Sequence, residues 1–219
     1  MRTTLAIVDA ELEVVPKEKL GGVKLRASSD ALFGKREVIL DHVLHADLVR
    51  AMPESNRRGR PDILHHALTL AISSIPYRMG DIDVVVHTRN NEAIYFGPKA
   101  EIPQNYFEFL RRLGDLYTDG QVDCREKRWA IETDRDLAHI VAKSRAEVRV
   151  LLSPVGEVKG LGKLMKGFQE NNAIIMFGGF PEGDFKSPVN DLADISVSLG
   201  PDLLNINAVT AEILRSLPY

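Results

Sequence analysis

The 219-residue sequence has a single cysteine, no long apolar run and no large excess of charge of either sign. With only Cys124, a disulfide within the chain is excluded, and such scarcity is typical of a reducing compartment. No hydrophobic stretch approaches the roughly 20 residues of a membrane-spanning helix, and residues 1–5 lack the apolar centre of a signal peptide. We therefore expect a cytoplasmic protein that does not enter a membrane.

The formal net charge of −3 argues against a general polyanion binder. Any contact with nucleic acid must then come from a local basic patch. The histidines also lack the pattern of a metal site: His42 and His45 are three apart and His65 is next to His66, but no carboxylate or cysteine supports either pair. We therefore expect no bound metal.

Strand-like and helix-like periodicities alternate along the chain, which is typical of an α/β domain with a mainly parallel sheet. We expect helices on both faces of that sheet and one domain over residues 1–219, with a small excursion near 16–40 that contains Gly21-Gly22 and Ser28-Ser29. The expected strands are 4–15, 83–89, 93–96, 148–152, 173–177 and 195–199. The expected helices are 41–52, 61–75, 103–117, 135–144, 158–169 and 206–217.

The segment Arg57-Arg58-Gly59-Arg60-Pro61-Asp62 places three guanidinium groups within four residues. Pro61 suits the first position of a helix, and Asp62 suits the first turn, from which it can orient Arg60. Planar guanidinium groups match the oxygens of a phosphate. The segment therefore indicates a phosphate-binding element, and the alternative is a solvated loop followed by a helix cap.

A second segment, Phe177 to Phe185, contains Gly178, Gly179 and Gly183 and directly follows an apolar strand. Ligands of open α/β sheets collect at the carboxyl ends of strands, where glycine permits close approach of the backbone. The segment completes no G-x-G-x-x-G fingerprint, and no phosphate-binding loop is formed at 157–164. From these residues alone, the segment could be either a ligand-binding loop or a tight turn.

A third segment, residues 195–205, runs from a strand through Leu199-Gly200-Pro201 into a helix. Its apolar side chains and backbone polar groups could enclose an adenine. Trp129 could stack on a base or lie in the core, and the apolar helix 206–217 could pack in the core or form a dimer interface.

Taken together, the order of these segments resembles the Nep1 (Emg1) family of SPOUT-class knotted methyltransferases, in its compact archaeal form. Members of that family methylate N1 of a pseudouridine in small-subunit (16S) ribosomal RNA. The resemblance covers the chain from Arg57 to its C-terminus. Its motifs are Arg60-Pro61-Asp62-Ile63, Val85-Val86-His87-Thr88, Ile102-Pro103, the loop 178–185 and the segment 198–205.

The resemblance implies an S-adenosyl-L-methionine-dependent rRNA methyltransferase with a C-terminal trefoil knot and a role in ribosome biogenesis. It implies a homodimer whose partners are small-subunit rRNA and, as further candidates, ribosomal proteins. The cofactor-binding residues would be Gly178, Gly179, Gly183, Ser196, Val197, Ser198, Leu199, Gly200, Pro201 and Leu203. The RNA-binding residues would be Arg57, Arg60, Gln104, Arg111 and Arg112.

The chain departs from the family pattern at Glu101, Gln104 and Glu108, where basic residues are expected; Arg111 and Arg112 follow one turn later as substitutes. Asp62 is the only candidate general base, and the alternative is that it orients Arg60. Methyl transfer mainly requires alignment of acceptor, methyl and sulfur, with the target base turned out of its loop. The alternatives are a non-catalytic RNA-binding small-subunit assembly factor and a methyltransferase that acts on uridine or on a ribose hydroxyl.

Overall fold

The computed structural model describes residues 2–20, 32–123, 125–168 and 170–217. Within them, eight strands form one sheet in the order β4-β5-β3-β2-β1-β7-β6-β8. Strands β2, β1, β7, β6 and β8 are parallel, whereas β3, β5 and β4 continue the sheet in antiparallel pairings. The mainly parallel α/β sheet is therefore confirmed. The strands are β1 (Thr3–Ala10), β2 (Ile82–Thr88), β3 (Ala93–Phe96), β4 (Gln121–Val122), β5 (Trp129–Glu132), β6 (Val148–Val158), β7 (Ala173–Gly178) and β8 (Ile195–Ser198).

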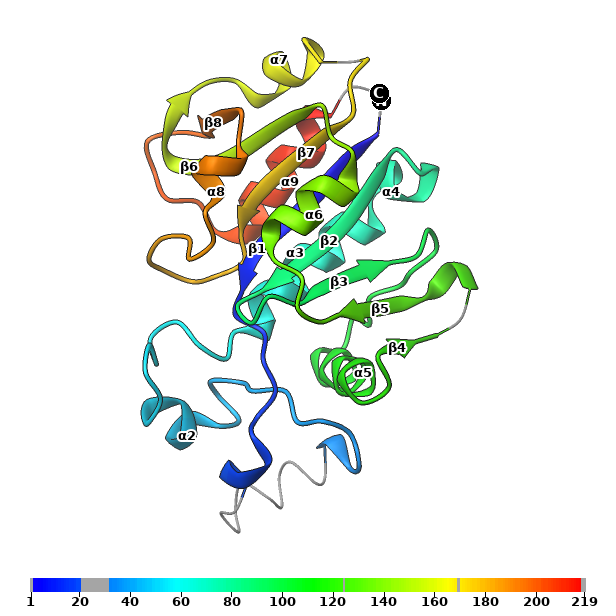
Figure 1. Cartoon of the computed structure of the whole chain (residues 1–219), viewed down its shortest axis with the longest axis vertical. Coiled ribbons are helices and arrows are strands. Elements are labelled where there is room, and N and C mark those ends of the chain that lie inside the picture. The colour runs from blue at the N-terminus through cyan, green and yellow to red at the C-terminus, as the bar shows by residue number, and fades with distance from the viewer. Residues whose placement is uncertain (1, 21–31, 124, 169, 218–219) are drawn as a thin grey trace.

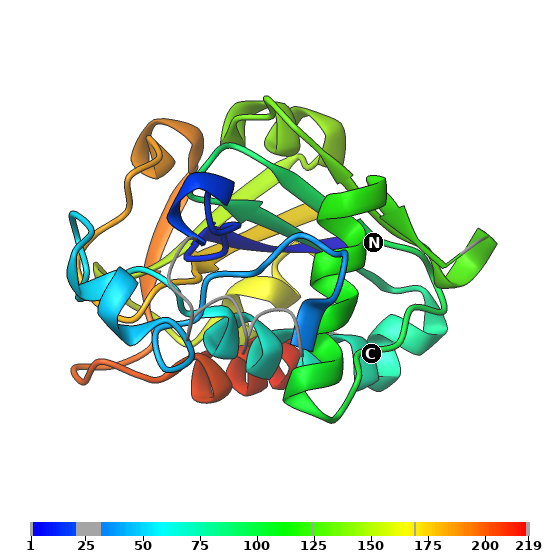
Figure 2. The same cartoon turned by 90° about the horizontal axis from the view of Figure 1, so that it is seen from below.

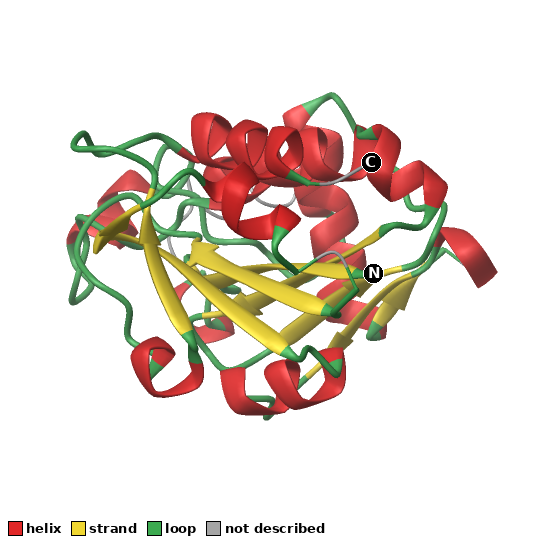
Figure 3. Ribbon diagram, turned by 90° about the horizontal axis from the view of Figure 1, so that it is seen from above, coloured by secondary structure: helices red, strands yellow, loops and turns green. Residues whose placement is uncertain are grey.

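Helices cover both faces of the sheet, as expected (Figure 3). One face packs against α3 (Pro61–Ser73), α5 (Tyr106–Asp119), α7 (Leu161–Lys166) and α9 (Ile206–Ser216). The opposite face packs against α6 (Leu137–Ser144) and α8 (Val189–Leu192). The central strands are therefore apolar on both sides. In β1, for example, Leu5 and Ile7 enter one core while Ala6 and Val8 enter the other, which explains why successive residues in these strands are hydrophobic.

The first expected strand, 4–15, is too long, because β1 ends at Ala10. Asp9 has a φ of 52°, and the register with β2 shifts between Ile7 and Ala10. The chain then leaves the sheet and forms an excursion at one end of it, which includes a short 3-10 helix (Lys17–Lys19) and α2 (Ala46–Arg50) (Figures 1 and 2). Residues 21–31, including both glycine and serine pairs noted above, lie outside the described residues.

Side-chain hydrogen bonds move the starts of two expected helices, through a turn at Asp41 before α2 and through an N-cap at Asn105 before α5. The carboxylate of Asp41 accepts hydrogen bonds from the backbone N–H groups of Val43 (2.8 Å) and Leu44 (2.9 Å), which forms a turn, so α2 begins only at Ala46. Asn105 accepts from the N–H of Phe107 (2.9 Å), so α5 begins at Tyr106 rather than at 103. Such caps supply partners for the first free N–H groups of a helix.

The expected helix at 158–169 is wrong at its start, because β6 continues to Val158 and α7 begins at Leu161. Leu152 and Glu157 both align with Val197 of β8, so residues 153–156 bulge out of the sheet between them.

Several elements were not anticipated. They are β4, β5, α8 and α4 (Ile75–Met79), the last of which is capped by Ser74. Trp129, in β5, is fully buried and packs on Phe96 and Phe109. Of its two interpretations, a core residue is therefore the correct one.

Candidate functional site

A cavity of about 240 Å³ lies at the bulge of β6 and at the carboxyl ends of β7 and β8. It is lined by residues 152–154, by most of 177–185, by residues from 197 to 204, and by two residues of α9. The carboxyl ends of parallel strands are the usual location of ligand sites in open α/β sheets. The glycine segment and the segment after β8, which are far apart in the sequence, therefore face the same space.

Most of the residues expected from the sequence to bind a cofactor line this cavity. They are Gly178, Gly183, Val197, Ser198, Leu199, Gly200 and Leu203, whereas Gly179, Ser196 and Pro201 are not part of the lining. Gly179 is needed for packing instead. A Cβ there would lie 2.8 Å from Cγ2 of Ile7 and 2.9 Å from Cα of Ala10, both closer than normal contact.

Other lining residues were not singled out from the sequence. Ser153 and Pro154 come from the bulge in β6, and Ile206 and Val209 come from the start of α9. Ser153 and Pro154 directly follow the strand expected at 148–152, and that position was the available signal for them. Periodicity contains no information about the order of strands, so it could not place β6 between β7 and β8.

The lining of the cavity is apolar and acidic. It includes the carboxylates of Glu182, Asp184 and Asp202, and no lysine, arginine or histidine occurs among the described residues that line it. Phe180 and Phe185 add an edge-to-face aromatic pair with ring centroids 5.2 Å apart. Carboxylates and aromatic faces attract cations. The site therefore suits a ligand with an apolar body and positive charge, and it is unsuited to phosphate groups.

The loop that follows β7 is tied to the end of β1 by Asp9. The Asp9 carboxylate accepts hydrogen bonds from the backbone N–H groups of Lys186 (2.7 Å) and Ser187 (3.0 Å) and from the Ser187 hydroxyl (2.6 Å). His87 Nδ1 lies 3.4 Å from an Asp9 oxygen. Burial would raise the pKa of Asp9, but these partners outweigh burial and lower that pKa to about 2. Asp9 is therefore an ionised acceptor at neutral pH.

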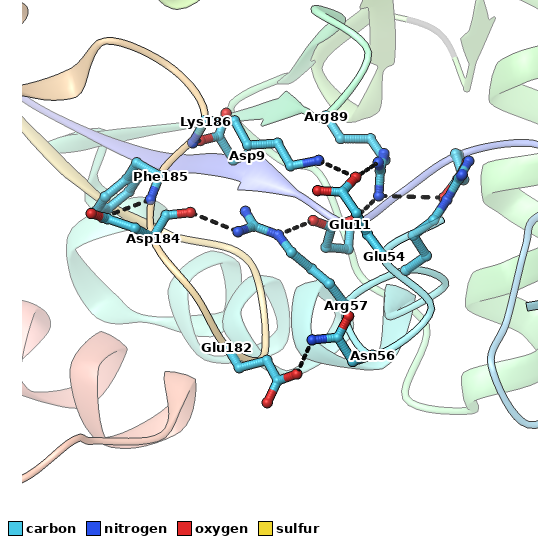
Figure 4. Close-up of polar contacts among 12 residues, drawn as sticks. Asp9, Glu11, Glu54, Asn56, Arg57, Arg89, Glu182, Asp184, Phe185 and Lys186 are labelled. Atoms are coloured by element: carbon cyan, nitrogen blue, oxygen red, sulfur yellow. Dashed lines mark hydrogen bonds and ion pairs between the residues drawn. The ribbon is translucent and has the colours of Figure 1, made fainter. Parts of the chain in front are cut away.

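Arg57 was expected to bind RNA, but its side chain is directed into the protein and the residue is only 6% exposed. It forms an ion pair with Glu11 and donates a hydrogen bond to the backbone oxygen of Asp184 at 2.6 Å (Figure 4). Its guanidinium carbon also lies 4.0 Å from the centre of the Phe180 ring. These groups occupy the guanidinium, so Arg57 would have to give up buried partners to contact RNA as predicted from the sequence.

Arg60 and Asp62 lie at the start of α3 and form a two-point ion pair, with Nε–Oδ1 and Nη2–Oδ2 distances of 2.9 and 2.8 Å. Both side chains are partly exposed. Burial acts to raise the pKa of Asp62, but the Arg60 hydrogen bonds and charge lower it overall. A carboxylate held in this way is a weak proton acceptor, so the geometry supports the orienting interpretation of Asp62 over the general-base one.

The remaining residues expected to bind RNA are on or next to α5. Gln104 is exposed and precedes the helix. Arg111 donates to Glu108 (2.6 Å) and to the backbone oxygen of Leu32 (3.0 Å), and Arg112 pairs with Asp123. Both arginines line a polar hollow of about 310 Å³. Their charges are thus already balanced by carboxylates.

No cluster of three or more histidine, cysteine, aspartate or glutamate side chains in the described part of the chain is arranged to hold a metal ion. Within the same residues, no helix has the length and apolar character required to cross a membrane.

The parallel sheet, the glycine loop and the acidic, apolar cavity define an α/β protein with a cavity of the cofactor-binding type. The family model described as EMG1/NEP1 methyltransferase matches residues 5–217, so the chain belongs to that family. The resemblance inferred from the sequence motifs and the expectation of a methyltransferase are thereby confirmed.

Relatives and solved structures agree with this membership. The chain is 38% identical to "Ribosomal RNA small subunit methyltransferase Nep1" of Methanothrix thermoacetophila, over 96% of this chain and 93% of that one. It is 32% identical to the protein of the same name from Pyrococcus furiosus, over 100% and 97% of the two chains. The crystal structure of Archaeoglobus fulgidus Nep1 bound to S-adenosylhomocysteine superimposes with a TM-score of 0.81, at 26% identity over 99% and 97% of the two chains.

Proposed function

We propose that this protein transfers a methyl group from S-adenosyl-L-methionine to N1 of a pseudouridine in small-subunit rRNA, in the cytoplasm, during ribosome biogenesis. The observation that carries the proposal is the cavity, which combines apolar walls with three carboxylates and has no basic side chain among its described lining residues. S-adenosylmethionine has an adenosine body, a sulfonium and an ammonium group, but no phosphate. The names of the rRNA methyltransferase relatives and the ligand of the Archaeoglobus protein support the assignment.

The cavity offers separate surroundings for the parts of this cofactor. Leu199, Leu203 and Val209 provide apolar contacts for the adenine, while Glu182, Asp184 and Asp202 provide negative charge for the cationic groups. When bound, S-adenosylmethionine would supply an electrophilic methyl group. The protein's task is then to hold the acceptor nitrogen in line with that methyl.

Arg60 is the residue we assign to the RNA backbone, because it is partly exposed and Asp62 fixes its orientation. Gln104 is exposed and available to the same ligand. Arg111 and Arg112 would have to exchange Glu108 and Asp123 for phosphate, so we expect smaller contributions from them. The target base would be turned out of a single-stranded loop, as enzymes that modify bases require.

We also propose the C-terminal trefoil knot and a homodimer. In support of the knot, the bulged part of β6 crosses β8 at very close range: a Cβ on Gly156 would lie 2.6 Å from the backbone carbon of Val197. In support of the dimer, Val155 and Val158 are 93% and 70% exposed on the part of β6 that follows the cavity-lining Pro154, and a partner subunit would cover them. Ribosomal proteins remain candidate partners.

The cofactor proposal is tested by calorimetric titration with S-adenosylhomocysteine. Gly200→Phe would place a ring at the cavity, because a Cβ at Gly200 meets no atom within 4 Å. Gly160→Phe is the matched control, since Gly160 is equally unobstructed and is not part of the cavity lining. We expect saturable binding by the wild type and by Gly160→Phe, and none by Gly200→Phe. A folded wild type that does not bind would contradict the enzyme proposal and favour an assembly factor without catalysis.

The substrate is tested with paired RNA hairpins that contain either uridine or pseudouridine at the same position. Transfer of a labelled methyl group to the pseudouridine hairpin alone is the expected result. Equal transfer to the uridine hairpin, or transfer to a ribose hydroxyl, would contradict N1 of pseudouridine as the acceptor. The homodimer is tested by sedimentation, where Val158→Glu should shift the protein toward the monomer.

A further inference from the structure

We propose that Arg57 is a positioning residue that holds the loop 178–187 in its cofactor-binding shape. The inference rests on the cofactor site proposed above. Arg57 belongs to a segment more than a hundred residues earlier in the chain, and it does not line the cavity itself. Its effect on the cofactor would therefore be exerted through the loop.

Arg57 contacts the loop at two points. It donates a hydrogen bond from Nη1 to the backbone oxygen of Asp184 (2.6 Å), and its guanidinium carbon lies 4.0 Å from the centre of the Phe180 ring. Both Phe180 and Asp184 line the cavity. Movement of either residue would change the shape of the wall against which the cofactor binds.

The other edge of the Arg57 guanidinium is anchored in the protein interior. Its Nε pairs with the carboxylate of Glu11, which is 1% exposed and follows β1. Glu11 also pairs with Arg89, Arg89 pairs with Glu54 (2.9 Å), and Glu54 pairs with Lys186 of the loop (Figure 4). The loop is thus connected to Glu11, next to the end of β1, by two routes: the Arg57 hydrogen bond to Asp184, and the ion pairs of Arg89 and Lys186 with Glu54. The pairs of Glu11 with Arg57 and Arg89 are buried and therefore costly to break, because the remaining charge is left without a partner.

The shape of the arginine side chain is essential to this arrangement. The Nη2 group of Arg57 is buried and donates to no hydrogen-bond partner, while the flat face of the guanidinium lies over the Phe180 ring. A planar guanidinium can pair at two edges and stack at the same time, whereas the ammonium of lysine offers one point charge. Lysine at this position should therefore replace the charge without restoring the full set of contacts.

Arg58 provides a matched control next to Arg57 in the chain. It is also partly buried and pairs with a buried carboxylate, with its Nε 2.8 Å from Glu13. Its hydrogen bonds and its ion pair are made with Glu13, outside the loop 178–187. Arg58→Met therefore removes a comparable ion pair while leaving the contacts with the loop in place.

The direct test is hydrogen exchange of the cofactor-free full chain. The N–H of Gly179 donates to Val8 (2.7 Å) and the N–H of Lys186 donates to Asp9 (2.7 Å), so exchange at both ends of the loop reports its attachment. We expect Arg57→Met to speed exchange in 179–187 about tenfold, the size expected for losing a hydrogen bond to a charged group. Arg58→Met should leave this region unchanged, and Arg57→Lys should give an intermediate rate.

Binding of S-adenosylhomocysteine provides the second readout. The dissociation constant should rise roughly tenfold in Arg57→Met, from the same lost contacts, and stay within about twofold of the wild type in Arg58→Met. Unchanged loop exchange in Arg57→Met, or an equal increase in both variants, would overturn the positioning role. If the wild type does not bind the ligand, the proposed function fails, and the exchange experiment still decides the role of Arg57.

Should Arg57→Met not fold, Glu11→Gln takes its place. This variant keeps the arginine but weakens its anchor, and it should speed exchange in the same loop residues. Normal loop exchange in folded Glu11→Gln would then overturn the proposal.

Discussion

Asp9 and Ser187 are joined by two hydrogen bonds, one from the Ser187 backbone N–H at 3.0 Å and one from its hydroxyl at 2.6 Å. They lie 178 positions apart in the sequence. The contact attaches the chain that follows the glycine loop to the end of the central strand. One buried carboxylate therefore links the sheet to the proposed cofactor site.

The Asp9 contact predicts a specific dependence of stability on pH. The pKa of Asp9 in the folded protein, about 2, is below the ordinary aspartate pKa of 3.8. Ionised Asp9 thus stabilises the fold fully above about pH 4, and this contribution is lost as the pH falls through 2. The side chain in Asp9→Asn cannot ionise. The difference in unfolding free energy between the wild type and this variant should therefore fall by about 2 kcal/mol as the pH is lowered from 5 to 2. Urea unfolding at a series of pH values measures this difference, and parallel pH curves for the two proteins would contradict it.

Replacing Asp62 distinguishes its two possible roles. If Asp62 orients Arg60, Asp62→Asn should weaken RNA binding roughly tenfold, about the worth of a charge-assisted pair, and leave S-adenosylhomocysteine binding unchanged. The single-turnover rate of methyl transfer at saturating RNA would then fall by less than about tenfold. A loss of a hundredfold or more under saturation would instead identify Asp62 as the general base, since proton transfer contributes about that much or more.

Trp129 should affect stability and have no selective effect on RNA binding. It is fully buried, and its indole N–H has no hydrogen-bond partner in the structure. Trp129→Phe therefore loses no hydrogen bond and should cost about 1–2 kcal/mol, whereas Trp129→Ala should cost about 3–5 kcal/mol. Because Trp129 is the only tryptophan, a blue-shifted emission that acrylamide quenches poorly would confirm its burial. Efficient quenching in the native protein would contradict it.

Gly156 should be sensitive to even the smallest side chain. A Cβ there would lie 2.6 and 2.7 Å from backbone atoms of Val197, which cannot move without disturbing β8. Gly156→Ala should therefore destabilise the protein by about 1–3 kcal/mol, as overpacking typically does. It should also weaken S-adenosylhomocysteine binding, because Val197 lines the cavity. Gly160→Ala is the control, because a Cβ at Gly160 meets no atom within 4 Å. Equal thermal midpoints for the two variants would contradict the close approach of Gly156 to the backbone of β8.

Local patterns predicted the helices and strands best where one strong signal marks each boundary. Helix α3 begins at Pro61 and strand β3 spans 93–96 as expected, and β7 and β8 differ from expectation by one residue. The errors occur where tertiary contacts override local preference. Asp9 ends β1 early with a positive φ, and β8 pairs with residues 157–158 and so holds them extended.

Predictions of individual site residues divided in a similar way. Gly178 was singled out because it directly follows an apolar strand, and ligands bind at strand ends, whereas Ser198 was assigned to the cofactor through the family resemblance. Arg57 and Arg60 are equivalent in a sequence pattern, since both are arginines in a polar loop. Only the fold distinguishes them, because it buries Arg57 against Glu11 and leaves Arg60 partly exposed beside Asp62.

The α/β class, the family and the segments that form the proposed cofactor site could be predicted from the sequence, because they depend on residue type and spacing along the chain. Which charges are free follows only from the folded structure. Whether an arginine meets a phosphate or a buried carboxylate depends on contacts between residues such as Arg57 and Asp184, 127 positions apart. The acidic character of the cavity likewise arises only when Glu182, Asp184 and Asp202 are brought to one wall, since electrostatic potential depends on distance in space.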